Sequence, residues 1–350
     1  MKHPLVAGVD DLSLDQRKFD PSPLDIERIC RFFGLGKLRH FEKEKNIVVS
    51  HSNFFAFVRT NQGGYALKFY PPQAARGISV EYALNRLLTG HRFATPLMHA
   101  GKDGRAWVCG CGRLAACYSY IDAAPAWQKI GQKKTIRAIN ASMLLLKRIL
   151  SAAGESLPVQ KQKTFGAQTH DLLRLSRDLR PYDQQETIEA CLLAACRAYQ
   201  RHEGLFVRQR LHNNAGLTNF LVDRKTVYTL DLGHVREDYA ISDLAGMVIS
   251  CVFFDTPPQT IRAIIEDYFA QHQMTQDSSA ALAVLVQTGL IKEYLKNIQR
   301  EKTLGSSLYP PGLLEAYRSL LAERKKSIRT VLKKGLLKGT GRRGRETALI

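Results

Sequence analysis

The chain has 350 residues, of which 45% are hydrophobic and 24% are charged, and its formal net charge is +19. This composition is typical of folded globular proteins and excludes a collagen-like, low-complexity or mainly disordered chain. The longest apolar run, Leu244 to Phe254, has 11 residues, against the roughly 20 that a transmembrane helix needs. No secretory signal is recognisable, and most of the seven cysteines lie in apolar segments. We therefore expect reduced thiols and a cytoplasmic protein.

The first half of the chain is predicted to form a small β-rich lobe over residues 46–122, after a leader of residues 1–45 that has helix potential over Pro23 to Phe33. Short apolar runs bounded by turn residues are typical of strands, and a helical repeat over Ile78 to Leu88 interrupts them. Asn61 to Gly64 is rich in residues that tolerate positive φ, which predicts a hairpin. The predicted strands are Asn46 to Ser50, Phe54 to Thr60, Tyr65 to Tyr70, Leu97 to His99, Arg105 to Cys109 and Leu114 to Tyr120.

The second half, residues 123–322, is predicted to be mainly helical, because its apolar residues follow the helical period. One β interruption is expected in it, formed by Asn219 to Val222 and Val227 to Leu230. The predicted helices are Ile136 to Leu150, Ala167 to Leu179, Thr187 to Tyr199, Ile241 to Phe254, Thr260 to Ala270, Ala280 to Ile298 and Gly312 to Ala322. The fold class is therefore α+β, with two lobes.

The last segment, residues 323–350, is a basic tail with ten lysines or arginines and no acid between Arg324 and Arg345. Such a run is typical of a solvated extension, but it also suits anionic lipid headgroups or, less well, nucleic acid. Leu332, Leu336 and Leu337 give it a short amphipathic face, which favours a membrane surface slightly.

Two groups of residues could carry chemistry. In the strand Tyr65 to Tyr70, alternation puts Ala66 and Lys68 on one face. Glu81, on the following helix, could pair with the Lys68 ammonium and direct it towards a phosphate, while Ala66 leaves room for a flat ring. A surface lysine and an unrelated helix glutamate are the ordinary alternative.

The second group is His212 to Asn219, followed after the hairpin by Asp231. The oxygens of Asn219 and Asp231 are the hard ligands that suit Mg²⁺ bridging nucleotide phosphates. Asp243, at the start of the long apolar helix, is expected to cap that helix or to support the loop.

Together and in this order, the two groups resemble the protein-kinase-like phosphotransferases, in particular the aminoglycoside phosphotransferase and homoserine kinase group. The lipopolysaccharide core sugar kinases are similar in their loop as well. The resemblance covers roughly Asn46 to Phe269. It implies a two-lobed protein-kinase-like fold, with ATP and Mg²⁺ as cofactors and a small molecule or sugar as the phosphoryl acceptor.

The resemblance also implies roles for individual residues. Ala66-x-Lys68 looks like the nucleotide-phosphate strand of the family, Glu81 like its helix partner, and Tyr118 to Asp122 like the hinge between the lobes. Ser52 lies in the turn that would cradle phosphate.

Further along, His212-x-Asn214-x-x-x-x-Asn219 resembles the catalytic loop H-x-D-x-x-x-x-N. Asp231-Leu232-Gly233 resembles the metal-binding D-F-G element. Asn214 and His212 are the catalytic candidates of this loop, His212 as a possible substitute base, although a structural part is the more ordinary role of a histidine here. His234 is expected to be a packed or surface histidine.

Two departures affect the expected activity. Asn214 stands where the family has its catalytic aspartate, and an amide can hold a hydroxyl but cannot take its proton. We expect a loss that is a large fraction of ~10²- to 10⁴-fold, because phosphoryl transfer depends chiefly on positioning and electrostatics. In addition, the turn Ser50 to Asn53 contains no glycine, which weakens the expected contact between its backbone and phosphate.

Three functions remain open: an ATP- and Mg²⁺-dependent phosphotransferase of low activity, a degenerate kinase fold that binds or regulates, and a protein that acts through its basic tail on anionic surfaces. Residues Asp255 to Ala322 carry seven acids and six bases, so they lack the carboxylate excess expected of a site for polycations. A sugar or an anionic acceptor is therefore slightly favoured.

Overall fold

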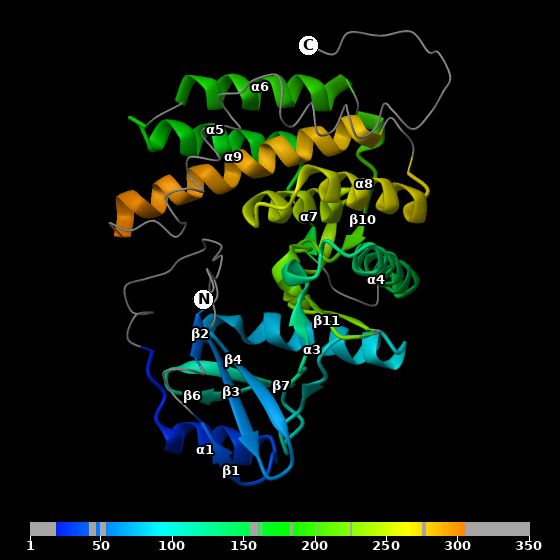
Figure 1. The fold of residues 1–350 in the computed structure, drawn as a ribbon. Coiled ribbons are helices and arrows are strands. Elements are labelled where there is room, and N and C mark those ends of the chain that lie inside the picture. The colour runs from blue at the N-terminus through cyan, green and yellow to red at the C-terminus, as the bar shows by residue number, and fades with distance from the viewer. Residues whose placement is uncertain are drawn as a thin grey trace.

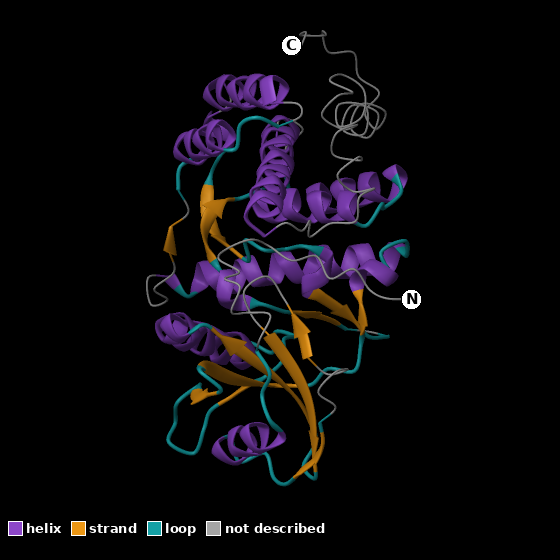
Figure 2. Ribbon diagram, turned by 90° about the vertical axis from the view of Figure 1, so that its left-hand side faces the viewer, coloured by secondary structure: helices purple, strands orange, loops and turns teal. Residues whose placement is uncertain are grey.

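The computed structural model describes residues 19–41, 47–49, 54–154, 160–161, 163–182, 185–201, 203–224, 226–274 and 278–304. Figures 1 and 2 show a sheet at one end of the molecule and a group of helices at the other. The fold is therefore the expected α+β type with a β-rich and a helical part. The limits assigned to the four segments of the chain stay a prediction.

The β-rich part is a seven-stranded antiparallel sheet in the order β1-β3-β4-β7-β5, with β2 also paired to β3 and β6 to β7. Its strands are β1 (Leu38–His40), β2 (Ile47–Val49), β3 (Phe54–Thr60), β4 (Gly64–Tyr70), β5 (Met98–His99), β6 (Val108–Gly110) and β7 (Arg113–Ser119). The turn 61–63 joins β3 to β4, as its composition predicts.

One helix covers each face of this sheet. Helix α1 (Pro23–Phe32), which begins with a Ser22 capping box, packs its Ile26 and Ile29 against Leu67 and Phe69. Helix α3 (Ala75–Gly90) packs on the opposite face (Figure 1). Because side chains alternate along a strand, Lys68 and Tyr70 point to the α3 side of β4.

The buried Asn85 helps to fix α3 to the sheet. The Asn85 amide donates to Pro96 O (2.9 Å) and accepts from the backbone N of Met98 (2.9 Å). Both polar ends of this side chain are therefore satisfied inside the protein, as burial requires. The contact holds α3 beside β5, and with it the glutamate that α3 carries.

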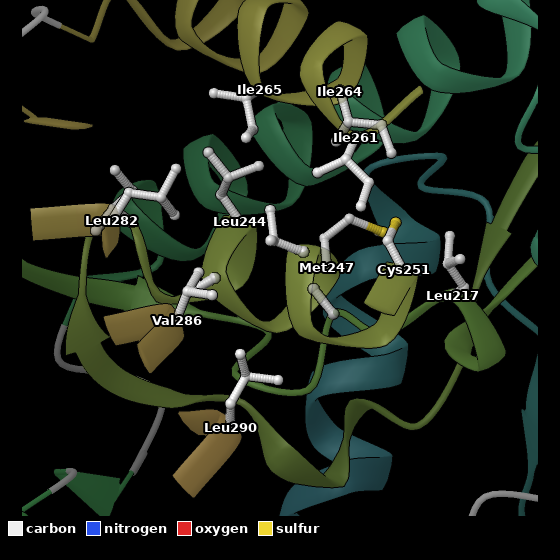
Figure 3. Close-up of a cluster of buried hydrophobic side chains, with 14 of the residues drawn as sticks. Leu217, Leu244, Met247, Cys251, Ile261, Ile264, Ile265, Leu282, Val286 and Leu290 are labelled. Carbon is white, nitrogen blue, oxygen red and sulfur yellow. The ribbon is translucent and has the colours of Figure 1, made fainter. Parts of the chain in front are cut away.

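The helical part contains α4 (Lys133–Ala152), α5 (Phe165–Asp178), α6 (Gln185–Arg201), α7 (Ser242–Phe253), α8 (Pro258–His272) and α9 (Ser278–Leu304). Its core forms where α7, α8 and α9 meet, with Leu244, Met247, Ile264 and Leu290 among its members (Figure 3). Leu217, from the loop that follows His212, joins the same core. The loop is thereby anchored to the most extensively buried part of the protein.

Two small sheets lie within the helical part, where the sequence predicted one β interruption. The predicted hairpin forms β11 (Phe220–Val222) and β12 (Val227–Thr229), joined by β8 (Ala124–Pro125). The second sheet was missed: β10 (Arg208–Leu211) pairs with β13 (Arg236–Tyr239), and β13 with β9 (Gln160–Lys161). Its strands read RQRL and REDY, so they lack the alternation of apolar residues by which a strand is recognised.

The remaining elements agree with the sequence within a few residues. Every predicted helix that falls in the described residues is present, whereas Gly312 to Ala322 and the basic tail lie outside them. β6 begins at Val108 instead of Arg105. Within the described part of the chain, no helix is both long and apolar enough to cross a membrane.

Candidate active site

The structure brings Lys68 and Asp231 together, although 163 residues separate them in the chain. Lys68 Nζ lies 2.8 Å from Asp231 Oδ1 and 3.8 Å from Glu81 Oε1. The Lys68 side chain is only 5% exposed, whereas 23% of the Asp231 side chain is exposed. The lysine is thus a buried charge, and Asp231 is the partner through which this ion pair meets solvent.

The two carboxylates determine the charge state of Lys68. Burial alone would lower the pKa of this lysine, but Asp231 and Glu81 outweigh it and raise the pKa above its ordinary value. Burial likewise acts to raise the pKa of Asp231, yet Lys68 and His234 hold it well below its usual range. Both groups are therefore charged near neutral pH.

Glu81 is held by two tyrosines whose contact with it the sequence analysis did not predict, although Tyr118 begins the expected hinge. Tyr118 OH donates to Glu81 Oε1 and Tyr70 OH donates to Glu81 Oε2, each at 2.8 Å. The two hydroxyl oxygens also lie 2.8 Å apart. Burial, followed by the nearby Glu81 charge, raises the pKa of both tyrosines well above the ordinary value, so both hydroxyls keep their protons at neutral pH.

The loop 212–219 is held by buried contacts at its first residue. His212 is fully buried, its Nε2 lies 2.7 Å from Leu230 O, and its Nδ1 accepts from the backbone N of Asn214 (3.2 Å). The imidazole therefore donates through Nε2 and accepts through Nδ1. This geometry gives His212 a structural part and leaves neither nitrogen for a substrate.

Asp243 supports the same loop from α7. Its Oδ2 accepts from the backbone N of His212 (3.1 Å) and its Oδ1 from the backbone N of Asn213 (2.7 Å). The side chain is buried, and burial raises its pKa. Of the two roles predicted for Asp243, supporting the loop is the one that these contacts show.

Asn214 contacts the ion pair directly. Its Nδ2 donates to Asp231 Oδ2 (2.9 Å), while its backbone oxygen accepts from Asn219 Nδ2 (2.7 Å). An aspartate in this position would place two carboxylates side by side, whereas the amide adds a donor and no charge. Asn214, Asn219 and Asp231 thus form one connected group.

Two residues of the site adopt the left-handed backbone conformation. Asn213 has φ 58° and Asp231 has φ 57°, values that are uncommon outside glycine, although asparagine and aspartate tolerate them best. With its amide oriented to satisfy both polar atoms, Asn213 donates to Asp238 Oδ2 (2.5 Å) and accepts from Arg236 Nε (2.8 Å). These contacts tie the loop to β13.

His234 contacts Asp231 directly and is therefore more than a packed or surface histidine. Its Nε2 lies 3.2 Å from Asp231 Oδ2, and its side chain is 43% exposed. Its neighbour Gly233 has no room for a side chain, because a Cβ there would lie 2.7 Å from Glu81 Oε2. The turn 231–234 therefore packs directly against α3.

The predicted metal ligands supply one carboxylate and one amide. Asp231 and Asn219 are hard oxygen ligands, and the Asn219 nitrogen is engaged by Asn214 O, which leaves its oxygen for a cation. No cluster of three or more His, Cys, Asp or Glu side chains suited to a metal occurs in the described part of the chain. The chemistry of these two oxygens is compatible with a magnesium ion, which would have to take most of its ligands from elsewhere and would compete with Lys68, Asn214 and His234 for Asp231.

Ala66 and Ser52 are the last two predicted residues, and both were expected to contact the nucleotide. Ala66 lies in β4 between Phe57 of β3 and Tyr118 of β7, so its small side chain stands on the same sheet face as Lys68. Ser52 and the turn around it lie outside the described residues.

Comparison with known proteins identifies a family and a fold for the chain. The sequence model of the phosphotransferase enzyme family matches residues 48–278. No curated protein sequence matches the chain.

Several solved structures share the fold at low sequence identity. An amicoumacin kinase in complex with AMP-PNP, Ca²⁺ and Ami has a TM-score of 0.67 at 11% identity, covering 91% of this chain and 100% of its own. An aminoglycoside phosphotransferase from Alicyclobacillus acidocaldarius has a TM-score of 0.61 at 13% identity, covering 86% and 93%. A choline/ethanolamine kinase family protein from Mesorhizobium loti has a TM-score of 0.58 at 12% identity, with the same coverage. The chain has the two-lobed fold of the protein-kinase-like phosphotransferases.

Proposed function

The chain belongs to the phosphotransferase enzyme family, and on this premise we propose that it transfers the terminal phosphoryl group of ATP to a hydroxyl of a small molecule or sugar. The observation that carries the proposal is the 2.8 Å contact between Lys68 Nζ and Asp231 Oδ1. In this proposal the contact brings a cation that would bind phosphate next to a carboxylate that would bind metal, beside an amide that could hold an acceptor.

Each residue has a distinct part in this proposal. Lys68 would leave Asp231 and bind phosphate oxygens of ATP, while Glu81 remains behind it to balance its charge. Asp231 and Asn219 would hold Mg²⁺, which supplies charge neutralisation to the phosphates when bound. His212 and Asp243 hold the loop in place and do not touch substrate.

Asn214 limits the rate in this scheme. Its nitrogen is engaged by Asp231, so its oxygen is the atom left to accept a hydrogen bond from the acceptor hydroxyl. The amide can position that hydroxyl but cannot keep its proton, which would pass to a phosphate oxygen or to water. The protein would thus work mainly by positioning its two substrates, with low turnover.

The alternative is a degenerate member of the family that binds nucleotide without turnover. The hydrogen bond from Asn214 Nδ2 to Asp231 Oδ2 favours this reading, because it stabilises the site in the absence of metal. A regulatory or binding module would need no proton acceptor at position 214.

A thermal-shift measurement tests whether the site binds nucleotide. We expect ATP and ADP at millimolar concentration to raise the melting temperature, and Mg²⁺ to increase the shift, because ligands that bind only the folded state stabilise it. Adenosine, which lacks phosphates, is the matched control. No shift with either nucleotide, with or without Mg²⁺, would contradict both readings of the site.

The substitution Asn214→Asp then separates the enzyme from the degenerate form. If the amide is what limits transfer, we expect ATP turnover to rise by up to roughly 10²- to 10⁴-fold, measured as ADP release with and without sugar acceptors. Stability without metal should fall, because two carboxylates then share the position. Asn61→Asp makes the same charge change at an exposed residue and serves as the control. Unchanged turnover, with activity already measurable in the native chain, would mean that another group takes the proton.

Two further parts of the proposal depend on the sequence alone. The balanced charge of residues 255–322 favours a sugar or an anionic acceptor over a polycation. The basic tail, outside the described residues, is proposed to contact anionic membrane surfaces, with nucleic acid a weaker candidate. Binding of the full-length chain to vesicles with and without anionic lipid, compared with the chain truncated after Ala322, tests the tail.

A further inference from the structure

The distance between Glu81 and Lys68 is longer than expected for a close ion pair. Glu81 was expected to pair with Lys68 and direct it towards a phosphate, yet Lys68 Nζ is 3.8 Å from Glu81 Oε1 and only 2.8 Å from Asp231 Oδ1. At 3.8 Å the ammonium and the carboxylate attract each other, but they are beyond hydrogen-bond distance. Lys68 therefore lies on the Asp231 side of the site.

The tyrosines explain this position. Glu81 Oε1 is the oxygen that faces Lys68, and it is the oxygen that accepts the 2.8 Å hydrogen bond from Tyr118 OH. Glu81 Oε2, which accepts from Tyr70 OH, is occupied by a different donor. A hydroxyl donor on an ionised carboxylate makes a strong, charge-assisted hydrogen bond. The Tyr118 hydroxyl thus occupies one of the two lone pairs of Oε1 and competes with Lys68 for this oxygen.

Tyr70 differs from Tyr118 because its ring makes a cation–π contact with Lys68. The Tyr70 ring lies under the ammonium, with Lys68 Nζ 4.7 Å from the ring centroid. This cation–π contact depends on the ring and is kept when the hydroxyl is removed. The two tyrosines therefore form a matched pair: both hydroxyls donate to Glu81, but only that of Tyr118 donates to the oxygen in front of Lys68.

We propose that Tyr118 is a positioning residue whose hydroxyl competes with Lys68 for Glu81 Oε1 and thereby assigns the lysine to Asp231 and to the phosphates that bind beside it. The inference rests on the proposed function and adds a residue to it. Without the hydroxyl, Lys68 moves back to Glu81. Two consequences of opposite sign follow: phosphate binding weakens because the lysine is withdrawn, and metal binding at Asp231 strengthens because the lysine no longer occupies it.

The test uses the full-length chain with Tyr118→Phe, Tyr70→Phe and Tyr82→Phe. Tyr82 lies next to Glu81 on α3 and packs on the same cluster as the other two, so its variant reports the loss of a nearby hydroxyl in general. Calorimetry measures the affinity for ADP, for adenosine and, without nucleotide, for Mn²⁺.

For Tyr118→Phe we expect the ratio of ADP to adenosine affinity to fall by about threefold to tenfold, the fold-change that corresponds to one ordinary hydrogen bond. We expect the affinity for Mn²⁺ alone to rise over the same range. Tyr70→Phe should change both quantities less, and Tyr82→Phe least. A structural defect would instead lower every affinity together. Opposite changes in the ADP and Mn²⁺ affinities would therefore indicate that Tyr118 positions Lys68.

A crystal structure of the Tyr118→Phe protein gives a readout that needs no nucleotide. We expect Lys68 Nζ within hydrogen-bond distance of Glu81 and withdrawn from Asp231. A lysine that stays on Asp231, or equal effects of Tyr118→Phe and Tyr70→Phe on affinity, would overturn the inference. If the native chain binds no ADP, the proposed function fails, and the position of Lys68 in the variant still decides the inference.

The substitution Tyr118→Met keeps the test open if Tyr118→Phe does not fold. It also removes the hydroxyl and leaves an apolar side chain against the cluster on which Tyr118 packs, so the same fall in the ratio of ADP to adenosine affinity and the same rise in Mn²⁺ affinity are expected. An unchanged ratio in Tyr118→Met would contradict the role given to the Tyr118 hydroxyl.

Discussion

The two sides of the site are built on different principles. The strand side, formed by Lys68, Tyr70, Glu81 and Tyr118, comes from regular elements and is joined through side-chain hydroxyls and charges. The loop side, residues 212–219 and 231–234, is held through its backbone, by Asp243 and by His212. Substitutions on the strand side should therefore change binding, whereas those under the loop side should change stability.

The largest effect is expected beneath the loop. Asp243→Ala leaves the backbone N–H groups of His212 and Asn213 without their buried acceptor, at a cost of about 1–3 kcal/mol for each donor. We expect the free energy of unfolding, from urea denaturation, to fall by about 3 kcal/mol in total. Asp178→Asn, at an exposed position on α5, is the control. A near-native stability of Asp243→Ala would remove the distinction between the two sides.

The matching change on the strand side is Lys68→Met, which keeps the length of the side chain and removes its charge. Hydrogen bonds to charged groups are worth about 1.5–3 kcal/mol, so the affinity for ADP should fall by roughly 10- to 100-fold. Adenosine affinity, measured in the same calorimetric series, should change little. If Lys68→Met instead lowers the free energy of unfolding as much as Asp243→Ala does, the strand side stabilises the fold in the same way as the loop side.

Lowering the pH should weaken the helical packing around His272 before it weakens the ion pair of Lys68 and Asp231. Burial lowers the pKa of His272, which stacks on Tyr268 between α8 and α4, to about 4. The unfolded chain takes up this proton near pH 6.5, so stability should fall as the pH drops from about 6.5 towards 4, by about 2 kcal/mol at pH 5. Asp231, with its pKa held well below the usual range, stays ionised there, and the contribution of its ion pair is lost only at lower pH.

Urea denaturation at pH 7.5 and pH 5 measures this difference. His272→Gln keeps a donor towards Asn140 O and has no proton to gain, so it should lose less stability on acidification than the native chain. Equal losses in the two proteins would assign the acid sensitivity to other groups.

The sequence predicted the strand side better than the loop side, for reasons that individual residues illustrate. Alternation along β4 placed Lys68 correctly, and the same alternation could have included Tyr70, two residues further on. Tyr118 could not be found in this way, because the register that sets it beside Ala66 joins strands about 50 residues apart. Local patterns carry no information on such a pairing.

On the loop side, motif order located His212, Asn214, Asn219 and Asp231, but not their surroundings. His234 was missed because a half-exposed histidine after a turn has no pattern of its own, and its contact with Asp231 depends on the left-handed backbone at that residue. The strands β10 and β13 were missed because they are polar and are stabilised by pairing with each other.

The close approach at Gly233 has a mechanical consequence. With no side chain between them, the turn 231–234 and the glutamate-bearing helix α3 touch directly, so a rotation of the β-rich part relative to the helices cannot leave Asp231 undisturbed. A closure around a ligand is therefore expected to move Asp231, the proposed metal ligand, in the same movement. Gly233→Ala would place a methyl group between the turn 231–234 and the Glu81 side chain of α3 and push the two apart.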